Sequence, residues 1–418
     1  MTKKSIKRRI LFIHQNIPGQ FPHLIQHYAR DPATEVMAIG ETRWVKQNLG
    51  KLPNGFRVAT YEMPTGLKQP DHPYLESTTL AVHRATAVAN RLSRLAKDGF
   101  VPDIVVAHPG WGETLFVKDV LPSARLVSYC EYFYRAQGQD VGFDPEYPAK
   151  PDDIMRLRVR NGINLLGLDA MDDGIAPTQW QRRCFPEEYH ARIEVVHDGV
   201  DTDLVRPDDS ATFTLPTGAI LKSDQEVITF VNRNLEPLRG FHVFMRALPE
   251  FLRSRPHAVV VIVGGDDVSY GPHPVQKSFR EQLLSELSEP LKPFLDRIHF
   301  LGRIPYGAYR RLLQVSTSHV YLTYPFVLSW SMLEAMASGC LVIGSATPPV
   351  AEVIQHEVNG LLVDFFDIEM LVRTMRFACE RRRNLEETAA RGRSTIVERF
   401  DLRRICLPQQ IHLVERSS

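Results

Sequence analysis

Short apolar runs rich in β-branched residues recur along the whole chain, separated by longer stretches with helical spacing. The runs are RILFI, EVMAI, FRVAT, DIVVA, RLVSY and IEVVH, followed by VITFVN, AVVVIVG, IHFLG, HVYLT and LVIG. Uninterrupted apolar strands are typical of parallel sheets that are covered on both faces. The pattern therefore predicts a doubly wound α/β fold. Helices are predicted over Leu80–Lys97, Phe241–Arg253, Phe279–Leu287 and Ile368–Arg381.

The series of strands is interrupted once, by the segment RPDDSATFTLPTGAILKSDQ, which is rich in Pro, Asp, Ser, Thr and Gly. We therefore expect a Rossmann-like domain over residues 1–205, a linker over 206–225 and a second Rossmann-like domain over 226–390. Residues 391–418 are expected to form a helical tail, with the first domain as the surface for its packing. Two such domains facing each other would enclose a cleft at the carboxyl ends of both sheets, where ligands of these folds bind.

Composition excludes several classes of protein. The chain has 418 residues with 50 basic and 49 acidic side chains, so no overall charge attracts nucleic acid. Five widely spaced cysteines without a CxxC pair favour neither a disulfide framework nor a zinc site. No apolar run approaches the length of a membrane span, and we expect a cytoplasmic protein. The basic cluster of Lys3, Lys4, Lys7, Arg8 and Arg9 fits a frayed, solvated terminus or, as an alternative, peripheral contact with the inner face of a membrane.

The segment FVNRNLEPLRGFHVFMRALPEF carries the first candidate site. An apolar strand is predicted to end at Asn232 and a helix to begin just after Gly240, which leaves Arg233 and Arg239 on the loop between them. Two guanidiniums beside a helix N-terminus suit a diphosphate, because forked hydrogen bonds add to the helix dipole and the free amides. The alternative is a pair of surface arginines next to a turn glycine.

The segment HVYLTYPFVLSWSMLEAMASGCLVIG shows a strand, a Pro-containing loop, a short helix with Glu334, a stop at Gly339 and another buried strand. Here the chain resembles the family 4 group of retaining glycosyltransferases with the GT-B fold, whose most recognisable stretch matches Leu333 to Gly339. The resemblance implies that Glu334 accepts hydrogen bonds from the ribose hydroxyls of a nucleoside diphosphate sugar. The alternative is a Glu that caps its helix or forms a salt bridge.

Two positions depart from the pattern of that family. Phe326 stands where the family usually has a second Glu, and Ser329 stands where a Gly is common. The resemblance implies that backbone amides of Leu328, Ser329 and Trp330 meet the sugar hydroxyls. The usual carboxylate contact to the sugar ring is missing, which puts donor choice and activity in question.

Other matches follow from the same resemblance. Arg233 and Arg239 fall on the basic pair that holds the diphosphate in that family, and the backbone near Arg303 and Ile304 would face the base. VVHDGVDTDLVRP resembles the turn at its domain junction, so residues 198–203 are expected to act as a hinge. Asp201-Thr202-Asp203 spells DxD, a metal-binding pattern elsewhere, but we interpret it as a helix-start cap and expect no metal.

Three features of the first domain bear on the site. The PGWGE segment after DIVVA places His108 at a strand end, where the family has a His near the sugar, although a lone His is often structural. The loop FIHQNIPGQF lacks a GxGxxG fingerprint, which weakens a dehydrogenase interpretation, and by analogy its Gly19 and Gln20 approach the diphosphate and the acceptor. The aromatic and acidic run over residues 129–148 either shapes an acceptor pocket or packs as an ordered surface loop.

The resemblance, together with these observations, implies a retaining, metal-independent glycosyltransferase without a cofactor. It would move a sugar from a UDP- or GDP-sugar to a hydroxyl acceptor in polysaccharide, glycolipid or glycoside synthesis, with His108, Arg233 and Arg239 as the catalytic residues. Two alternatives stay open: a nucleotide-sugar epimerase on the same architecture, and a catalytically silent subunit that binds sugar nucleotides. No motif in the sequence specifies the sugar, the base, the acceptor or the oligomeric state.

Overall fold

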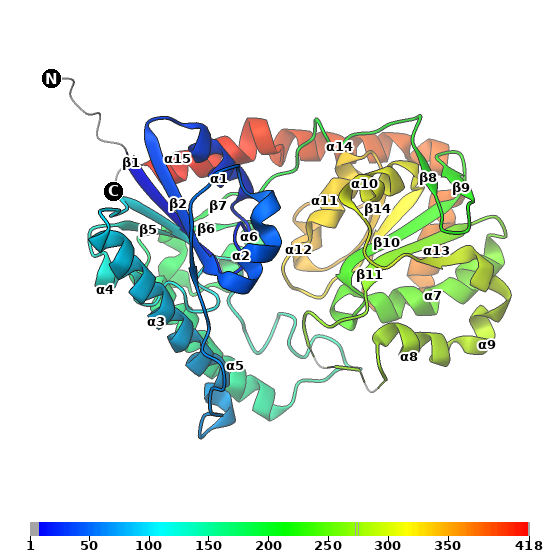
Figure 1. Ribbon diagram of the computed structural model, residues 1–418. Coiled ribbons are helices and arrows are strands. Elements are labelled where there is room, and N and C mark those ends of the chain that lie inside the picture. The colour runs from blue at the N-terminus through cyan, green and yellow to red at the C-terminus, as the bar shows by residue number, and fades with distance from the viewer. Residues whose placement is uncertain (1–7, 272, 275, 417–418) are drawn as a thin grey trace. The chain divides into compact units, whose positions relative to one another are not determined.

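The chain folds into two compact units in the computed structural model, which describes residues 8–271, 273–274 and 276–416 (Figure 1). Unit 1 contains the residues up to Asp198 together with the segment from Cys406 onward, and unit 2 runs from Gly199 to Ile405. Each unit is built on one parallel sheet, so the predicted α/β class with two Rossmann-like domains is confirmed. Lys3, Lys4 and Lys7 of the basic cluster lie outside the described residues.

The sheet of unit 1 has seven parallel strands in the order β3-β2-β1-β4-β5-β6-β7. Its strands are β1 Arg8–Ile13, β2 Thr34–Glu41, β3 Val58–Tyr61, β4 Ile104–Ala107, β5 Arg125–Tyr129, β6 Asp173–Ala176 and β7 Ile193–Val195. Alternate residues of β1 enter different core clusters, since Ile10 and Phe12 pack on one face and Leu11 and Ile13 on the other. Both faces of the sheet are therefore buried, as continuous apolar strands require.

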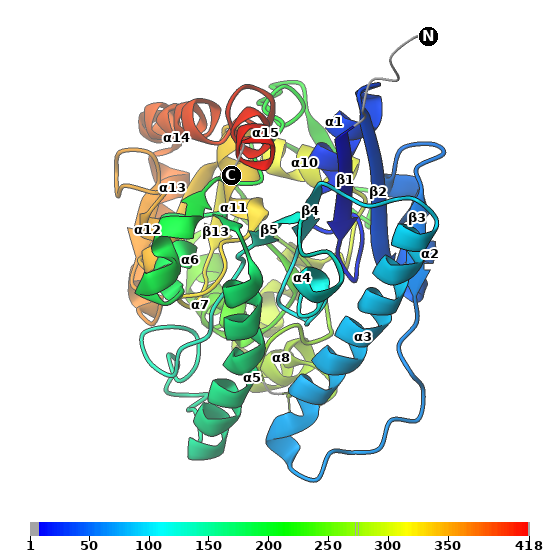
Figure 2. The same cartoon turned by 90° about the vertical axis from the view of Figure 1, so that its left-hand side faces the viewer.

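Helices cover both faces of this sheet, and α3 and α5 run side by side on one of them (Figure 2). The α-helices of unit 1 are α1 Pro22–Arg30, α2 Thr42–Asn48, α3 Glu76–Lys97, α4 Val117–Val120, α5 Pro151–Ala170, α6 Gln179–Cys184 and α15 Leu407–Glu415. Its 3-10 turns are η1 Leu49–Lys51, η2 Pro73–Leu75 and η3 Glu187–Arg192. No helix among the described residues of either unit is long and apolar enough to cross a membrane.

Unit 2 repeats the strand order of unit 1 in a sheet of six parallel strands, β12-β11-β10-β13-β14-β15. These strands are β10 Val227–Asn234, β11 Val259–Gly265, β12 Ile298–Phe300, β13 Ser318–Tyr321, β14 Leu341–Ser345 and β15 Leu361–Val363. In both parallel sheets the order reverses direction beside the first strand of the sheet along the chain, at β1/β4 and at β10/β13. A crevice at the carboxyl ends of the strands forms at such a switch point, and ligands of doubly wound folds bind there.

Two layers of helices cover the sheet of unit 2 (Figure 1). The α-helices are α7 Phe241–Ser254, α8 Phe279–Glu286, α9 Ser288–Leu291, α10 Tyr306–Val315, α11 Trp330–Ala337, α12 Pro348–Ala351, α13 Ile368–Glu380 and α14 Glu386–Arg399. Shorter turns are η4 Pro237–Arg239, η5 Lys292–Arg297, η6 Arg382–Leu385 and the π-helical segment η7 Leu402–Cys406. On one face Phe230 of β10 stacks on Phe244 of α7, with ring centroids 4.6 Å apart. On the other face residues of α10, α11 and α14 join the core around Val227 and Val261.

The domain boundaries differ from those that the sequence predicted. Residues 206–225, expected as a linker, contain the antiparallel hairpin of β8 Thr212–Thr214 and β9 Ile220–Lys222 within unit 2. Phe213 and Leu221 at the centres of these strands are buried in the unit 2 core, while their neighbours are exposed. The predicted boundary between residues 390 and 391 falls inside α14. Polar residues on the outer face of the hairpin account for its linker-like composition.

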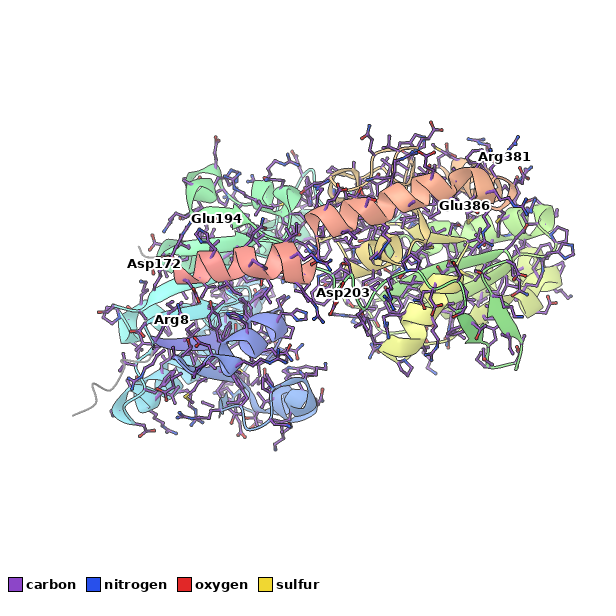
Figure 3. All side chains as sticks on the ribbon, turned by 90° about the horizontal axis from the view of Figure 1, so that it is seen from above. Arg8, Asp172, Glu194, Asp203, Arg381 and Glu386 are labelled. Carbon is purple, nitrogen blue, oxygen red and sulfur yellow. The ribbon has the colours of Figure 1, made fainter. Side chains whose placement is uncertain are left out.

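The last helix, α15, belongs to unit 1, on which Figure 3 shows it lying. Arg125 of β5 donates hydrogen bonds to the main-chain carbonyls of Leu413 and Val414 at 2.8 and 2.9 Å, which satisfies orphan carbonyls at the end of the helix. The same guanidinium pairs with Asp173, and the side chain of Arg125 is buried while that of Asp173 is partly buried. Near the start of the helix, Gln410 donates to the carbonyl of His197 at 3.0 Å.

Candidate functional site

The turn from β10 into α7 brings Arg239 to the switch point of unit 2. After β10 the chain makes the η4 turn over Pro237–Arg239, and Gly240 then enters α7 with a φ of +67°. A Cβ at Gly240 would lie 2.9 Å from Cδ1 of Leu322, so both the backbone conformation and the space require glycine. The side chain of Arg239 is thus fixed next to the N-terminus of a helix of 14 residues.

Arg239 is buried and held by its own unit. Its Nη1 donates to the Tyr321 hydroxyl at 3.3 Å, to Thr323 Oγ1 at 2.9 Å and to the main-chain carbonyl of Val327 at 2.9 Å. The guanidinium also lies 5.7 Å from the centre of the Phe326 ring, a cation–π contact. The two hydrogens of Nη1 are shared among these three acceptors, and together with the ring contact they orient the planar group before any ligand binds.

Arg233 differs from Arg239 in both position and contacts. The strand β10 continues to Asn234 with a register irregularity between Val231 and Asn234, so Arg233 lies on the strand and not on the loop that the sequence predicted. A bulge at the end of the strand explains the difference, because an apolar pattern does not show where pairing stops. Arg233 is exposed and makes no hydrogen bond or ion pair with the described residues. Its charge is available to an anion.

Glu334 lies on α11 and is held by two tyrosines of α10. Its Oε1 accepts a hydrogen bond from the Tyr306 hydroxyl at 2.6 Å, and its Oε2 accepts one from Tyr309 at 2.9 Å. Burial raises the pKa of the Glu334 carboxyl above its usual value, while the two tyrosines and Arg310 oppose the increase. The structure therefore places Glu334 in a partly buried site with hydrogen-bonding capacity left on each oxygen.

The loop before α11 is ordered by aromatic packing and hydrogen bonds. The buried ring of Phe326 meets the Tyr270 ring edge-on, with centroids 4.7 Å apart. The backbone amide of Ser329 donates to the Tyr321 hydroxyl at 2.7 Å. This amide is therefore already bound within the protein, whereas the family resemblance implied that it binds a sugar hydroxyl. Leu328 is buried in the unit 2 core and Trp330 is 46% exposed.

The segment expected to face the base begins after β12. Arg303 donates from Nη2 to Asn234 Oδ1 at 3.0 Å and to Asp267 at 3.1 Å, and this links the segment to the end of β10. Ile304 is partly buried against the unit 2 core. These two residues therefore lie near the switch point, next to the tyrosines that hold Glu334.

Glu236 is a site residue that sequence reasoning missed. Its side chain is buried, and Oε2 accepts hydrogen bonds from the backbone amides of Ser269 and Tyr270 at 3.1 and 2.9 Å. Burial raises the pKa of this carboxyl, and the two amides and Arg239 oppose the increase. An acid between Leu235 and Pro237, in the same short loop as Arg239, was the available signal. Glu236 ties the segment after β11 to the arginine turn.

Three strand ends meet at the switch point of unit 1. His14 follows β1, His108 follows β4 and Glu131 follows β5, and these three strands are neighbours in the sheet. The two imidazole rings have centroids 5.4 Å apart, and His108 stacks on Trp111 at 4.2 Å. The sequence predicted His108 here. It missed His14 and Glu131, because their proximity depends on the strand order.

A chain of hydrogen bonds joins these residues. His108 Nδ1 accepts the Gly110 amide at 3.0 Å, so the neutral ring carries its proton on Nε2 and donates to Glu131 Oε2 at 3.2 Å. The other oxygen of Glu131 accepts from Gln20 Nε2 at 3.2 Å. Gln20 Oε1 in turn accepts from Nε2 of His14 at 2.7 Å. The Glu131 carboxylate thus accepts hydrogen bonds from both Gln20 and His108.

Burial and hydrogen bonding determine the protonation states of His14 and Glu131. Desolvation, followed by the proximity of His108, lowers the pKa of His14 to about 3, so His14 is neutral near pH 7. Burial acts against the charge of Glu131, but the hydrogen bonds that the carboxylate accepts from His108 and Gln20 oppose burial, and the pKa of this carboxyl is lowered. Glu131 is therefore the anionic member of the cluster.

Gly19, the glycine singled out in the sequence, packs against the ring of His14. Its φ is +53°, and its amide donates to the carbonyl of Asn16 at 2.8 Å in a tight turn. Gln20 follows directly and enters the hydrogen-bond chain. Part of the aromatic and acidic run also lines a small cavity next to His108, through Tyr132 and Tyr134.

The segment Asp201–Asp203 does not begin a helix. Asp201 Oδ1 accepts the amide of Leu204 at 3.2 Å and its carbonyl accepts the amide of Val205, which closes a turn within unit 2. The capping chemistry was correctly inferred, but no helix follows, since residues 206–208 include a proline and continue as coil. Within the described residues, no group of three or more His, Cys, Asp or Glu side chains is arranged to hold a metal ion.

Two family profiles match the chain on either side of the junction. Residues 32–205 match the profile described as glycosyl transferase family 4 group, and residues 217–395 match glycosyl transferases group 1. The chain belongs to the group 1, family 4 glycosyltransferases. The resemblance inferred from Leu333 to Gly339 is thereby confirmed.

Curated relatives of this glycosyltransferase match over part of their length. A D-inositol 3-phosphate glycosyltransferase of Nocardioides sp. is 30% identical over 214 residues, which are 48% of this chain and 44% of the relative. The enzyme of the same name from Mycolicibacterium smegmatis is 30% identical over 185 residues, 43% of this chain and 38% of the relative. The chain thus spans less than half of these relatives.

Solved structures of low sequence identity share the whole fold. Anabaena Alr3699/HepE in complex with UDP superposes with a TM-score of 0.67 at 16% identity and covers 98% of this chain and 100% of its own. Sucrose-phosphate synthase from Thermosynechococcus elongatus has a TM-score of 0.68 at 16% identity, with 97% and 98% covered. These likenesses identify the GT-B fold of this glycosyltransferase.

Proposed function

We propose that this glycosyltransferase moves a sugar from a nucleoside diphosphate sugar, a UDP- or GDP-sugar, to a hydroxyl acceptor with retention at the anomeric carbon. The observation that carries the proposal is the switch point of unit 2, where Arg233 lies at the end of β10 and Arg239 and the first turn of α7 follow directly after it. This arrangement supplies two positive charges and a helix N-terminus to one place, as a diphosphate requires. Alr3699/HepE, which shares the fold, is known in complexes with UDP and UDP-glucose.

The chemistry follows from where charge develops. The bond between the anomeric carbon and the phosphate oxygen breaks, and a bond to the acceptor oxygen forms on the same face of the sugar. The acceptor proton passes to the leaving phosphate oxygen, so no protein nucleophile is needed. Arg239, fixed by three hydrogen bonds, and the exposed Arg233 stabilise the diphosphate as it departs. The proposal includes neither a metal nor a cofactor.

The remaining residues of unit 2 are assigned to the nucleoside and the sugar. Glu334 accepts hydrogen bonds from the ribose hydroxyls, and the backbone of Arg303 and Ile304 contacts the base. The amides of Leu328 and Trp330 serve the sugar hydroxyls. Ser329 is withdrawn from this role because its amide is bound to Tyr321.

Unit 1 is assigned to the acceptor side, with His108 and Gly19 near the reacting hydroxyl. The acceptor class is polysaccharide, glycolipid or glycoside, and the reaction takes place in the cytoplasm or at the inner face of a membrane.

One observation favours a second candidate, a silent subunit that binds sugar nucleotides without turnover. Phe326 packs its ring against Arg239 and Tyr270 where the family usually has a Glu, so no carboxylate reaches the sugar from this position. A protein of this kind would keep the diphosphate site and lose transfer.

Incubation with a panel of nucleotide sugars separates the candidates, with nucleotide release measured in the presence and absence of hydroxyl acceptors. Acceptor-dependent release with an α-configured product from an α-configured donor is the expected result. Turnover that needs no acceptor and yields a new sugar nucleotide would establish an epimerase instead. Binding without release under any condition would establish the silent subunit.

A further inference from the structure

The two side chains that meet at 3.2 Å in unit 1 differ in their access to solvent. The side chain of His108 is 4% exposed and that of Glu131 is 30% exposed. Both nitrogens of His108 already have partners, since Nδ1 accepts the Gly110 amide and Nε2 donates to Glu131. The imidazole therefore has no nitrogen left for a ligand unless its contact with Glu131 breaks.

Glu131 retains hydrogen-bonding capacity. A carboxylate offers about four acceptor positions. The structure uses one position on each oxygen, for Gln20 and for His108. Because both partners donate, they favour the ionised form and fix the plane of the carboxylate. The carboxylate is thus charged, oriented and partly open.

A cavity of about 50 Å³ lies against this carboxylate, within unit 1. Its lining includes the rings of Trp111, Tyr132 and Tyr134 together with His108 and Glu131. A volume of this size has room for roughly three to five water-sized groups, which is less than a hexose ring occupies. It suits one arm of a larger molecule.

Other polar groups on the wall already have partners. The Tyr132 hydroxyl donates to Asp140 at 2.9 Å, and the Tyr134 hydroxyl accepts from Arg160 at 3.0 Å. The open positions of Glu131 make it the strongest hydrogen-bond acceptor on the wall. Its negative charge disfavours an anionic arm and suits a neutral donor such as a hydroxyl.

We propose that Glu131, and not His108, is the group of unit 1 that binds a substrate hydroxyl. The ligand is a neutral polyol or sugar that inserts a hydroxymethyl arm into the cavity and donates to the Glu131 carboxylate. The aromatic rings pack on the carbon of this arm. His108 and Gln20 are positioning residues that hold the carboxylate. This inference rests on the proposed function, since it assigns the hydroxyl-binding group of the acceptor side.

Binding of glycerol to the full chain tests the proposal without requiring turnover. The four tryptophans give four indole N–H signals, and the signal missing from W111F identifies Trp111. Titration with glycerol is expected to shift the Trp111 signal to saturation in the wild type, and to require at least tenfold more glycerol in E131Q. Trp330 of unit 2 is the internal control. Glycerol trimethyl ether, which cannot donate a hydrogen bond, is expected to leave the Trp111 signal in place.

Two further variants guard against misfolding. E131D keeps the charge but withdraws it by one methylene, so weakened glycerol binding with an unchanged thermal midpoint supports a role in binding. E188Q changes an exposed glutamate of unit 1 and serves as the matched control. An E131Q protein that binds glycerol as the wild type does would overturn the proposal. So would an imidazole ¹⁵N spectrum that places the His108 proton on Nδ1.

A kinetic assay of sugar transfer separates this proposal from the proposed function. With a donor and acceptor that support transfer, E131Q is expected to raise the acceptor KM at least tenfold and to leave UDP affinity unchanged. Unchanged acceptor kinetics in E131Q would refute the role of Glu131 while transfer itself stands. No transfer by the wild type with any acceptor would refute the proposed function, and the glycerol titration would still decide on Glu131.

Discussion

Arg239 donates a 2.9 Å hydrogen bond from Nη1 to the main-chain carbonyl of Val327. This bond ties the turn before α7 to the loop before α11, so the proposed diphosphate site and the proposed sugar site share one anchor. Mutation of a side chain that both binds the diphosphate and anchors the loop should lower affinity and stability together. Mutation of a side chain that only supplies charge should lower affinity alone.

Arg233 and Arg239 are expected to separate these two effects. R239A should weaken UDP binding about tenfold and also lower the thermal midpoint, because it removes three hydrogen bonds and a ring contact from a buried position. R233A should weaken UDP binding to a similar degree without a loss of stability, since the residue is exposed and unpaired among the described residues. Calorimetric titration with UDP and thermal unfolding measure both quantities.

The control for this pair is R311A, which removes an exposed arginine of α10 in the same unit. It is expected to leave UDP affinity within twofold of the wild type, by the usual insensitivity of surface sites. Equal UDP affinity of R239A and the wild type would show that the diphosphate binds elsewhere.

Glu334 is expected to distinguish ribose from deoxyribose. The wild type should bind UDP about tenfold more tightly than 2′-deoxy-UDP, because a hydrogen bond to a charged group contributes about 1.5–3 kcal/mol. E334A should bind the two nucleotides equally, and E369Q, on the exposed surface of α13, should keep the wild-type ratio. A persistent preference for UDP in E334A would remove Glu334 from the ribose site.

The sequence predicted those parts of the fold that depend on local pattern. The helix expected over Phe241–Arg253 is observed over Phe241–Ser254, because its apolar face has a clear helical period. The strand β6, DGIA, was missed, since four residues with an Asp and a Gly resemble a loop. Its position in the sheet comes from pairing with β5 and β7, which are distant in sequence.

The same distinction holds for the site. Arg239 and His108 lie on strand-to-helix connections that a doubly wound pattern already places at a switch point. The contact between His108 and Glu131 joins the ends of β4 and β5, and the contact between Gln20 and Glu131 joins the loop after β1 to the same carboxylate. The order of the strands in the sheet decides these contacts. A single sequence does not give that order, so it predicts which residues lie at strand ends but not which of them contact each other.

The anchoring of α15 predicts that mutation of two arginines of unit 1 changes the free energy of unfolding to very different degrees. Arg125 is buried, binds two carbonyls of α15 and pairs with Asp173, so R125A is expected to cost about 3 kcal/mol or more of unfolding free energy. Arg8 pairs with Glu415 of the same helix at a partly exposed position, and R8A should cost about 1 kcal/mol or less. Figure 3 labels Arg8, the partly exposed member of this comparison.

Urea unfolding followed by circular dichroism measures the two free energies, and hydrogen exchange of the α15 amides locates the effect. Faster exchange in α15 of R125A, with the amides of α14 unchanged, is expected. Similar unfolding free energies for R125A and R8A would mean that Arg125 does not hold the helix.

Acid should destabilise unit 2 through His319. Burial lowers the pKa of His319 to about 3 in the folded chain, below its ordinary value of 6.5. Between these values the unfolded chain binds a proton that the folded chain does not, so stability is complete above pH 6.5 and falls as the pH decreases toward 3. The loss due to this residue is about 2 kcal/mol at pH 5.

H319N cannot titrate and keeps a polar atom near Thr229, the partner of Nδ1. Its unfolding free energy is expected to fall less than that of the wild type between pH 7.5 and pH 5, by about 2 kcal/mol. H257N, at an exposed position of the same unit, should follow the wild type. Parallel pH curves for H319N and the wild type would contradict the assignment.

Two glycines of unit 1 have a consequence for how the site responds to mutation. A Cβ at Gly19 would lie 2.5 Å from Nε2 of His14, and a Cβ at Gly110 would lie 2.7 Å from Cε1 of His108. One methyl group at either position would displace an imidazole without removing any functional group. An alanine scan is designed to report the loss of side chains. In this unit it would give two of its strongest signals at residues that have no side chain to lose.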